Sequence, residues 1–207
     1  ALPGWGRSGL AQAVQEELGT KVAFENDVNL AALGEQWLGL GKGVENFVYL
    51  HVGTGVGAGL VLRGEPYRGH TGAAGEVGYL PIGGDPRDKI LRRRGVLDTE
   101  AGASGVVATA RRLGMEPPLS PRKVFAAARR GDRIARRVVE LEADRIALAA
   151  AAIVPIVDPE LVVLGGGIGR NGDLLLEPVT QALRAVTPLA VRLEVSPLGE
   201  EAVVLGA

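Results

Sequence analysis

The feature that most constrains this chain is a run of alternating glycines between two apolar segments. Residues 53–59 read Gly-Thr-Gly-Val-Gly-Ala-Gly, and they lie between Phe47–Val52 and Leu60–Leu62. Glycine at every second position leaves the backbone N–H groups of a turn unobstructed, so they can converge on a phosphate or a sugar oxygen. Glycine-rich turns are common, so this one indicates a function only together with its neighbours.

The glycine turn belongs to a longer string of motifs. Residues 25–29 read Glu-Asn-Asp-Val-Asn, residues 72–78 read Gly-Ala-Ala-Gly-Glu-Val-Gly, and three glycines follow far downstream at 165–167. In order, spacing and residue type, this string resembles the large C-terminal half of the ROK family, which contains bacterial sugar kinases and sugar-responsive repressors. The resemblance covers nearly the whole chain.

Bulk composition excludes several classes of protein. A chain of 207 residues with a net charge of −1 gives no indication of a nucleic-acid surface. The absence of cysteine excludes disulfides and thiolate metal sites. The most apolar stretch spans 12 residues (146–157) and contains Pro155, so it is too short for a bilayer. With no basic-then-apolar leader, we expect a soluble cytoplasmic protein with no membrane partner.

Hydrophobic periodicity predicts alternating strands and helices. The predicted strands cover 21–24, 46–52, 59–62, 77–82, 161–164, 191–195 and 202–205. The predicted helices cover 10–18, 28–38, 99–113, 121–130, 132–153 and 173–186, the first with Ser8 as its N-cap and Gly19 as its stop. This order predicts an α/β fold, a mixed sheet flanked by helices, in one compact domain over residues 1–207.

The resemblance implies the ribonuclease H-like, actin-like ATPase fold of the hexokinase type, whose ligands bind in a cleft between two halves. Residues 1–5 are similar to the family's crossover into the large half, and the usual Asp-x-Gly-Gly-Thr phosphate loop of the first half is absent. The chain also stops where family members continue into a final helix. We therefore expect a fragment, with the small N-terminal domain and any DNA-binding domain outside this chain.

The resemblance also implies a role for the Asn26-Asp27 pair. In a kinase of this family, Asp27 would be the catalytic base that accepts the proton of the attacking sugar hydroxyl. Asn26 carries a carbonyl and an amide on one short arm, which suits contacts with sugar hydroxyls. Either residue could instead cap the helix that starts near Val28, and both roles can hold together.

Further sugar contacts follow from the same resemblance. Glu76 and Glu100 would accept hydrogen bonds from vicinal sugar hydroxyls, and Gly55 would belong to the sugar-binding set. Glu76 stands among glycines and would be costly to bury without a partner, which favours a ligand beside it. Glu100 could instead belong to a solvated helix start beside Asp98.

One position departs from the pattern of the zinc-bearing members of the family. These place a histidine directly after Gly-Glu-x-Gly and three cysteines shortly downstream, whereas this chain has Tyr79 and no cysteine. Zinc needs three or four nitrogen or sulfur ligands, so we expect no bound zinc and no metal site. Tyr79 would supply a hydroxyl to the sugar or pack in the core.

Two glycine clusters resemble the nucleotide-side loops of the family. The first matches its second phosphate loop and comprises Gly53, Thr54, Gly55 and Gly57. The second matches its adenosine-side turn and comprises Gly165, Gly166 and Gly167, which open a helix where a nucleotide could bind. Close packing of a helix on a strand also requires glycine. Repressors of the family keep many of these glycines without needing ATP, so the clusters alone do not decide the function.

The remaining polar features favour structural interpretations. The chain has two histidines, His51 and His70, and a structural role is the simpler interpretation of each. The basic triplet at 92–94 is typical of a solvated face and is poor evidence for DNA binding.

Three functional hypotheses follow from the resemblance. The first is the sugar-sensing, effector-binding domain of a ROK transcriptional repressor, which would be a homodimer or tetramer, need no cofactor, and contact DNA through a domain outside this chain. The second is an ATP-dependent, glucokinase-like sugar kinase, which would need ATP and Mg²⁺. The third is a degenerate relative with neither role. The missing zinc motif and the stretch at 77–86 favour the repressor.

Overall fold

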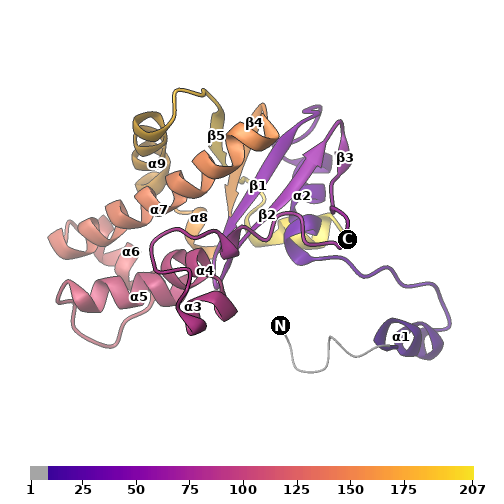
Figure 1. Cartoon of the computed structure of the whole chain (residues 1–207), viewed down its shortest axis with the longest axis horizontal. Helices are drawn as coiled ribbons and strands as arrows, with labels where there is room; N and C mark the ends of the chain where they lie inside the picture. The colour runs from indigo at the N-terminus through magenta and orange to yellow at the C-terminus, as the bar shows by residue number, and fades with distance from the viewer. Residues whose placement is uncertain (1–8) are drawn as a thin grey trace.

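The computed structural model describes residues 9–207, and a mixed five-stranded sheet organises this part of the chain. The strand order is β3-β2-β1-β4-β5, formed by Glu65–Pro66, Val56–Leu62, Phe47–Val52, Leu161–Gly165 and Arg192–Val195. β1 pairs antiparallel with β2 and parallel with β4, and β4 pairs parallel with β5. The carboxyl ends of β1 and β4 therefore lie side by side at one edge of the sheet (Figure 1).

Helices cover both faces of the sheet, which confirms the predicted fold class (Figure 1). One face carries the larger core with α4 (Val96–Ala101), α5 (Ala103–Arg112), α6 (Pro121–Arg129), α7 (Arg133–Val157) and α9 (Gly172–Val186). The opposite face carries α2 (Asp27–Leu38) and α10 (Ala202–Leu205). No helix in the described range is both long and apolar enough to cross a bilayer.

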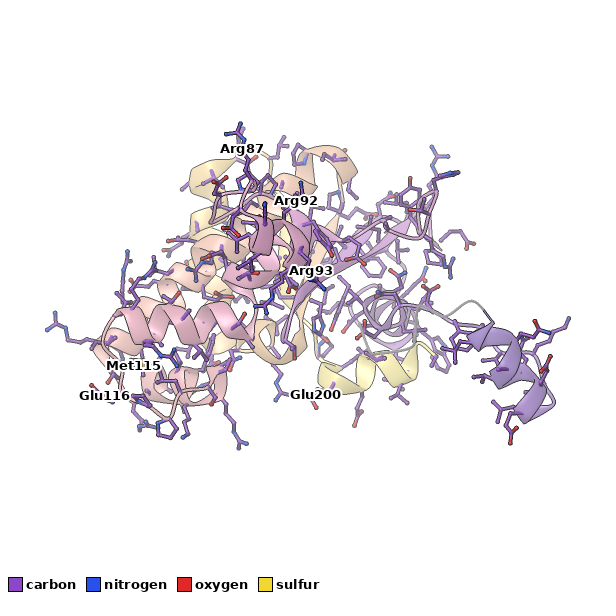
Figure 2. All side chains as sticks on the ribbon, turned by 60° about the horizontal axis from the view of Figure 1, so that its bottom comes forward. Arg87, Arg92, Arg93, Met115, Glu116 and Glu200 are labelled. Atoms are coloured by element: carbon purple, nitrogen blue, oxygen red, sulfur yellow. The ribbon has the colours of Figure 1, made fainter. Side chains whose placement is uncertain are left out.

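Shorter elements complete the described chain. α1 (Leu10–Leu18) stands apart from the sheet in both views (Figures 1 and 2). The others are η1 (Val77–Tyr79), α3 (Lys89–Arg94), α8 (Gly166–Gly169) and η2 (Gly199–Glu201).

The central strand β1 divides its side chains between two cores. Val48, Leu50 and Val52 belong to the larger core, whereas Phe47 and Tyr49 belong to the smaller one. This alternation is the period of two that a strand buried on both faces requires. Because the strand is covered on both faces, the turn that follows it leaves the sheet from a fixed position.

Helix α2 approaches β2 closely because Gly59 has no side chain. A Cβ atom at Gly59 would lie 2.6 Å from the carbonyl oxygen of Val28 and 2.7 Å from the Cβ of Ala32, both on α2. Any larger residue would push the helix away from the sheet. The helix therefore lies directly over β2.

Three of the predicted strands are wrong. Residues 21–24 have no regular secondary structure. Residues 77–82 open with the short helix η1, because the chain turns at Gly75 (φ +88°), where the Gly75 carbonyl accepts a hydrogen bond from the Ala58 amide of β2. Residues 202–205 form helix α10, since a short apolar run fits a strand or a buried helix equally well.

The predicted helix over 99–113 is two helices. α4 ends at Ala101 and α5 begins at Ala103, because Gly102 between them has an extended backbone (φ −72°, ψ 178°). α4 also begins earlier than predicted, at Val96, and the short helix α3 before it was not predicted.

The end of α7 also differs from the prediction. α7 continues past Ile153 to Val157, with Pro155 in its last turn, where the missing N–H costs one helical hydrogen bond. Ser8, the predicted N-cap of the first helix, lies outside the described residues. The helices predicted over 28–38, 121–130 and 173–186 are confirmed, with shifts of one residue.

A buried carboxyl joins α7 to α4 and α5. Glu142 is fully buried, and its Oε2 lies 3.4 Å from Nη1 of Arg145. The same guanidinium donates to Thr109 at 3.0 Å and lies 3.6 Å from Glu100. Oε1 of Glu142 has no hydrogen-bond partner in the described chain. Burial therefore raises the pKa of Glu142 from 4.5 to about 8, although Arg145 acts in the opposite direction.

This raised pKa predicts a pH-dependent stability. Between pH 4.5 and 8 the native Glu142 carboxyl keeps a proton that the unfolded chain releases, so the free energy of unfolding falls as pH rises through this window. One such proton contributes a slope of up to about 1.4 kcal/mol per pH unit. Urea unfolding at several pH values should show this slope in the wild type and a weaker one in Glu142→Gln.

Glu140→Gln is the matched control, because Glu140 is exposed on the same helix. It should keep the wild-type slope. Parallel stability curves for the wild type and Glu142→Gln would show that Glu142 is ionised in the native state.

Candidate functional site

Four of the six predicted sugar-binding residues, Asn26, Asp27, Gly55 and Glu76, line one cavity of about 430 Å³, which we call the acidic cavity. Its walls are the start of α2, the turn after β1, the loop before η1 and one residue of α4. Three carboxylates line it, from Asp27, Glu76 and Asp98. The remaining lining residues are Asn26, Val28, Asn29, His51, Thr54, Gly55, Val56, Gly57, Ala58, Gly72, Ala74 and Gly75.

Asn26 and Asp27 serve as helix caps and also face the acidic cavity. Asn26 is the N-cap of α2, and its Oδ1 accepts a hydrogen bond from the Val28 amide at 2.8 Å. Asp27 Oδ1 accepts from the same amide at 2.9 Å. Both side chains are exposed, and each keeps polar atoms that bond to no other described residue. The capping interpretation is confirmed, and sugar contact stays a prediction that the geometry permits.

Glu25 fixes the approach to this helix. Its carboxylate accepts from Nδ2 of Asn29 at 2.8 Å, from Nε of Arg68 at 2.5 Å and from the Asn26 amide at 3.0 Å. Burial alone would raise the pKa of Glu25, but these hydrogen bonds hold it below its ordinary value. The ion pair with Arg68 ties the start of α2 to the loop that carries Glu76.

The third carboxylate of the cavity, Asp98, was not predicted. It lies in the first turn of α4, and its Oδ1 accepts from the Val56 amide at 2.8 Å, so it also fixes the start of β2. Glu100 was predicted in its place, but it lies outside the lining of the acidic cavity and pairs with Arg145. The sequence signal for Asp98 was a carboxylate in the first turn of a helix, because α4 begins at Val96, directly after Gly95.

Tyr79 occupies neither predicted place. Its side chain is 57% exposed, so it does not pack in the core, and it does not line the acidic cavity. It ends the short helix η1, where the chain leaves the cavity wall that contains Glu76.

A second cavity of about 460 Å³ adjoins the acidic one. His51 and Thr54 line both cavities. The second cavity is also lined by Tyr49, Gly53, Gly166 and Gly167. The rest of its lining comes from α5, α6, the end of α8, and the segment of η2 and α10: Ala103, Pro121, Arg122, Ile168, Arg170, Gly199, Glu200 and Val203. Two cavities therefore meet at the turn that follows β1.

Two backbone hydrogen bonds of Gly53 fix the turn between the cavities. The Gly53 amide donates to the Gly55 carbonyl at 2.9 Å, and the Gly53 carbonyl accepts from the Ala103 amide at 3.0 Å. Within residues 9–207, the amides of Thr54 and Gly55 have no protein acceptor. Free amides on a fixed glycine turn are suited to bind an anionic oxygen.

The other predicted glycines divide between ligand cavities and packing. Gly57 lines the acidic cavity, and Gly166 and Gly167 line the second cavity. Gly165 is buried at the end of β4, where the hydroxyl of Tyr49 occupies the space of a side chain. Close packing therefore explains Gly165, although its neighbour is a tyrosine of the adjacent strand β1 and not a helix.

The two histidines differ in their surroundings. His70 is exposed on the loop before Gly72. His51 is partly buried in β1, and its buried Nδ1 has no hydrogen-bond partner among the described residues. A satisfied structural role therefore does not describe His51. Burial lowers its pKa, while the nearby charge of Asp27 acts in the opposite direction.

The segment at the position of the zinc motif is a basic surface. Figure 2 shows Arg92 and Arg93 on α3 and Arg87 just before it, and all three are exposed. Within the described chain none of them forms an ion pair, in keeping with a solvated face. Nor do residues 9–207 contain a group of three or more histidine, cysteine, aspartate or glutamate side chains placed to hold a metal ion.

Comparison with known proteins shows both enzymes and regulators. The chain is 34% identical to a glucokinase of Halalkalibacterium halodurans, over 98% of this chain and 67% of that protein. It is 30% identical to a xylose repressor of Caldicellulosiruptor bescii, over 98% of this chain and 55% of the repressor. The crystal structure of the ROK hexokinase from Thermus thermophilus superposes with a TM-score of 0.81 at 33% identity, covering 95% of this chain and 66% of that one.

The chain thus spans about two thirds of the two kinases and about half of the repressor. The sequence profile of the ROK family matches residues 1–207. Because the match extends over the whole chain, and relatives at this identity share it, the chain belongs to the ROK family.

Proposed function

We propose that this chain is the sugar- and nucleotide-binding domain of an ATP-dependent sugar kinase. The observation that supports the proposal is that the two cavities share His51 and Thr54, so ligands in both would meet at one turn. The acidic cavity offers carboxylates to hydroxyl groups, and the second offers glycine amides to an anion. A sugar sensor needs only the first cavity. The presence of two adjoining cavities therefore favours the kinase, whereas the sequence alone favoured the repressor.

Asp27 would act as the general base of the transfer. Its carboxylate lies in the acidic cavity at the N-terminus of α2, held by the Val28 amide through one oxygen. It would accept the proton of a sugar hydroxyl while that oxygen attacks the terminal phosphoryl group and the nucleoside diphosphate leaves. Phosphoryl transfer depends mainly on positioning and charge stabilisation, so one well-held carboxylate is sufficient.

The other polar groups of the acidic cavity would orient the sugar. Asn26 Oδ1 is occupied as the helix cap, which leaves its amide group to donate to a hydroxyl oxygen. Glu76 and Asp98 would accept hydrogen bonds from further hydroxyls. The Glu25–Arg68 ion pair would hold the loop that contains Glu76 at a fixed distance from the base.

The second cavity has the chemistry to hold the phosphoryl donor. The free amides of Thr54 and Gly55 belong to the turn between the cavities, where Thr54 lines both cavities and Gly55 lines the acidic one. Arg122 and Arg170 line the second cavity farther along. ATP bound there would supply the transferred phosphoryl group. Mg²⁺ would arrive with it, since that ion retains water and phosphate ligands rather than an all-protein cage.

The effector-binding domain of a repressor is the second candidate. Tyr79 at the histidine position and the likeness to a xylose repressor favour it. In that case a sugar would bind in the acidic cavity without turnover, and DNA would be contacted by a segment outside this chain. A homodimer or tetramer stays a prediction for either candidate.

Removing the charge of Asp27 separates the two candidates. In a coupled ADP-release assay on the full-length protein across hexoses, pentoses and N-acetylated sugars, we expect the wild type to turn over at least one sugar. In Asp27→Asn, kcat should fall at least about 100-fold, because loss of a general base costs this much. The KM for the sugar should change far less, since Asn retains the hydrogen-bonding geometry.

Asp144→Asn, an exposed substitution on α7, is the control and should keep wild-type kcat. Wild-type turnover at background, with sugar binding intact, would contradict the kinase and support the repressor. Turnover that persists undiminished in Asp27→Asn would contradict the role of Asp27.

A second pair of variants tests which acid of α4 contacts the sugar. Asp98→Asn keeps an oxygen for the Val56 amide but loses the charge, and we expect sugar affinity to fall about 10-fold, the effect of one hydrogen bond to a charged group. Glu100→Gln, two residues away and outside the cavity, should bind within about 2-fold of wild type. Isothermal titration calorimetry measures both. Equal losses, or a larger loss in Glu100→Gln, would restore Glu100 as the sugar contact.

A further inference from the structure

His51 occupies the position where the two cavities meet. It lies one residue before the end of β1, opposite Gly57 on β2 and opposite Gly165 on β4. Both of its neighbours across the sheet therefore lack side chains. The histidine ring is thus the side chain that fills this part of the sheet edge, and it lines both cavities.

The imidazole ring lies against both glycine turns. A Cβ atom at Gly53 would lie 2.6 Å from Nε2 of His51, and a Cβ atom at Gly166 would lie 2.9 Å from its Cε1. The ring of Tyr49 is 6.4 Å away, centroid to centroid. Nε2 therefore faces the turn that presents the free amides of Thr54 and Gly55.

The hydrogen bonds of the ring indicate a neutral imidazole with one available donor. Nδ1 is buried and has no partner in the described chain, so a proton on it would be an unpaired buried N–H. The tautomer with hydrogen on Nε2 leaves only a lone pair at Nδ1 and directs the N–H toward Gly53. Burial lowers the pKa of His51, which favours this neutral form, while Asp27 opposes the shift.

Charged side chains line the cavity on each side of the ring. Asp27, Glu76 and Asp98 line the acidic cavity, and Arg122, Arg170 and Glu200 line the second one. A permanent cation at position 51 would interact with Asp27 and weaken it as a base. A neutral donor can bind an anionic oxygen and leave the charge of Asp27 available.

We propose that His51 is a substrate-contacting residue that donates its Nε2–H to a phosphoryl oxygen held between the Gly53–Gly55 turn and the turn at Gly166. This inference rests on the proposed kinase function and assigns a phosphate contact to a residue that the glycine motifs do not include. The phosphoryl group would then have donors from the backbone amides on one side and from the imidazole on the other.

Imidazole NMR tests the contact directly, because the chain has only two histidines. His70→Gln, an exposed substitution, identifies the remaining signal as His51. Adding a non-hydrolysable ATP analogue with Mg²⁺ should shift the His51 signal and raise its titration midpoint by about one pH unit, because an anionic oxygen stabilises the imidazolium. Glucose alone should cause a much smaller change.

Two variants separate the contact from packing. His51→Gln retains an amide donor, and its affinity for the analogue should stay within about 3-fold of wild type. His51→Leu retains volume without a donor, and its affinity should fall at least about 10-fold. His70→Gln should match wild type throughout, because His70 is exposed and lines neither cavity.

The outcomes distinguish this inference from the proposed function. If the analogue binds while the His51 signal and titration stay unchanged, or if both variants bind it like wild type, the phosphate contact is wrong and the kinase proposal stands. If the analogue does not bind even with sugar present, the second cavity is not a nucleotide site and both proposals fail.

Discussion

Helix α2 rests directly on strand β2, and the geometry of the site depends on this contact. Gly59 leaves room for the Val28 carbonyl, and the smaller core closes the remaining space around Ala31 and Ala32. At the other end of the helix, the buried Glu35 accepts from the Leu40 amide at 2.9 Å and bonds to Ser196. The helix is thus fixed at both ends, so its first turn has little freedom relative to the sheet.

The charges of the site follow from differences in burial. Asp27 lies in the acidic cavity with water access, and one backbone amide holds one of its oxygens, so the position of its charge is defined. Glu142, which is fully buried, keeps its proton to about pH 8 and contributes no charge to the interior at neutral pH. His51 is partly buried, between the exposed Asp27 and the buried Glu142, and burial favours its neutral form. Negative charge is therefore concentrated where a hydroxyl proton would be accepted.

Local patterns in the sequence predicted four of the five strands of the sheet and most helices. The resemblance to the ROK family, rather than periodicity, implied the residues around Asp27. The alternating glycines and the Asn26 cap are local motifs of a few residues, so they could be interpreted without knowing which distant segments pack against them. Asp98 was missed because the boundary of α4 depends on Gly95 and Gly102, whose backbone angles appear only in the folded chain. The misassigned strand at 202–205 needed knowledge of the helix packed against it.

Local sequence patterns could not predict the contacts between distant segments. The Glu25–Arg68 pair joins residues 43 positions apart, and no periodicity connects them. The same holds for the second cavity, whose lining joins the turn after β1 to the turn after β4. The adjacency of the two cavities, rather than any single motif, supports the proposal of a kinase.

In the proposed function, a sugar and a nucleotide bind together on either side of His51. A crystal structure of the protein with glucose and a non-hydrolysable ATP analogue tests it most directly. We expect a sugar hydroxyl within hydrogen-bond distance of Asp27 and the terminal phosphate against the amides of Thr54 and Gly55. A sugar bound away from Asp27, or a nucleotide bound outside the second cavity, would contradict it.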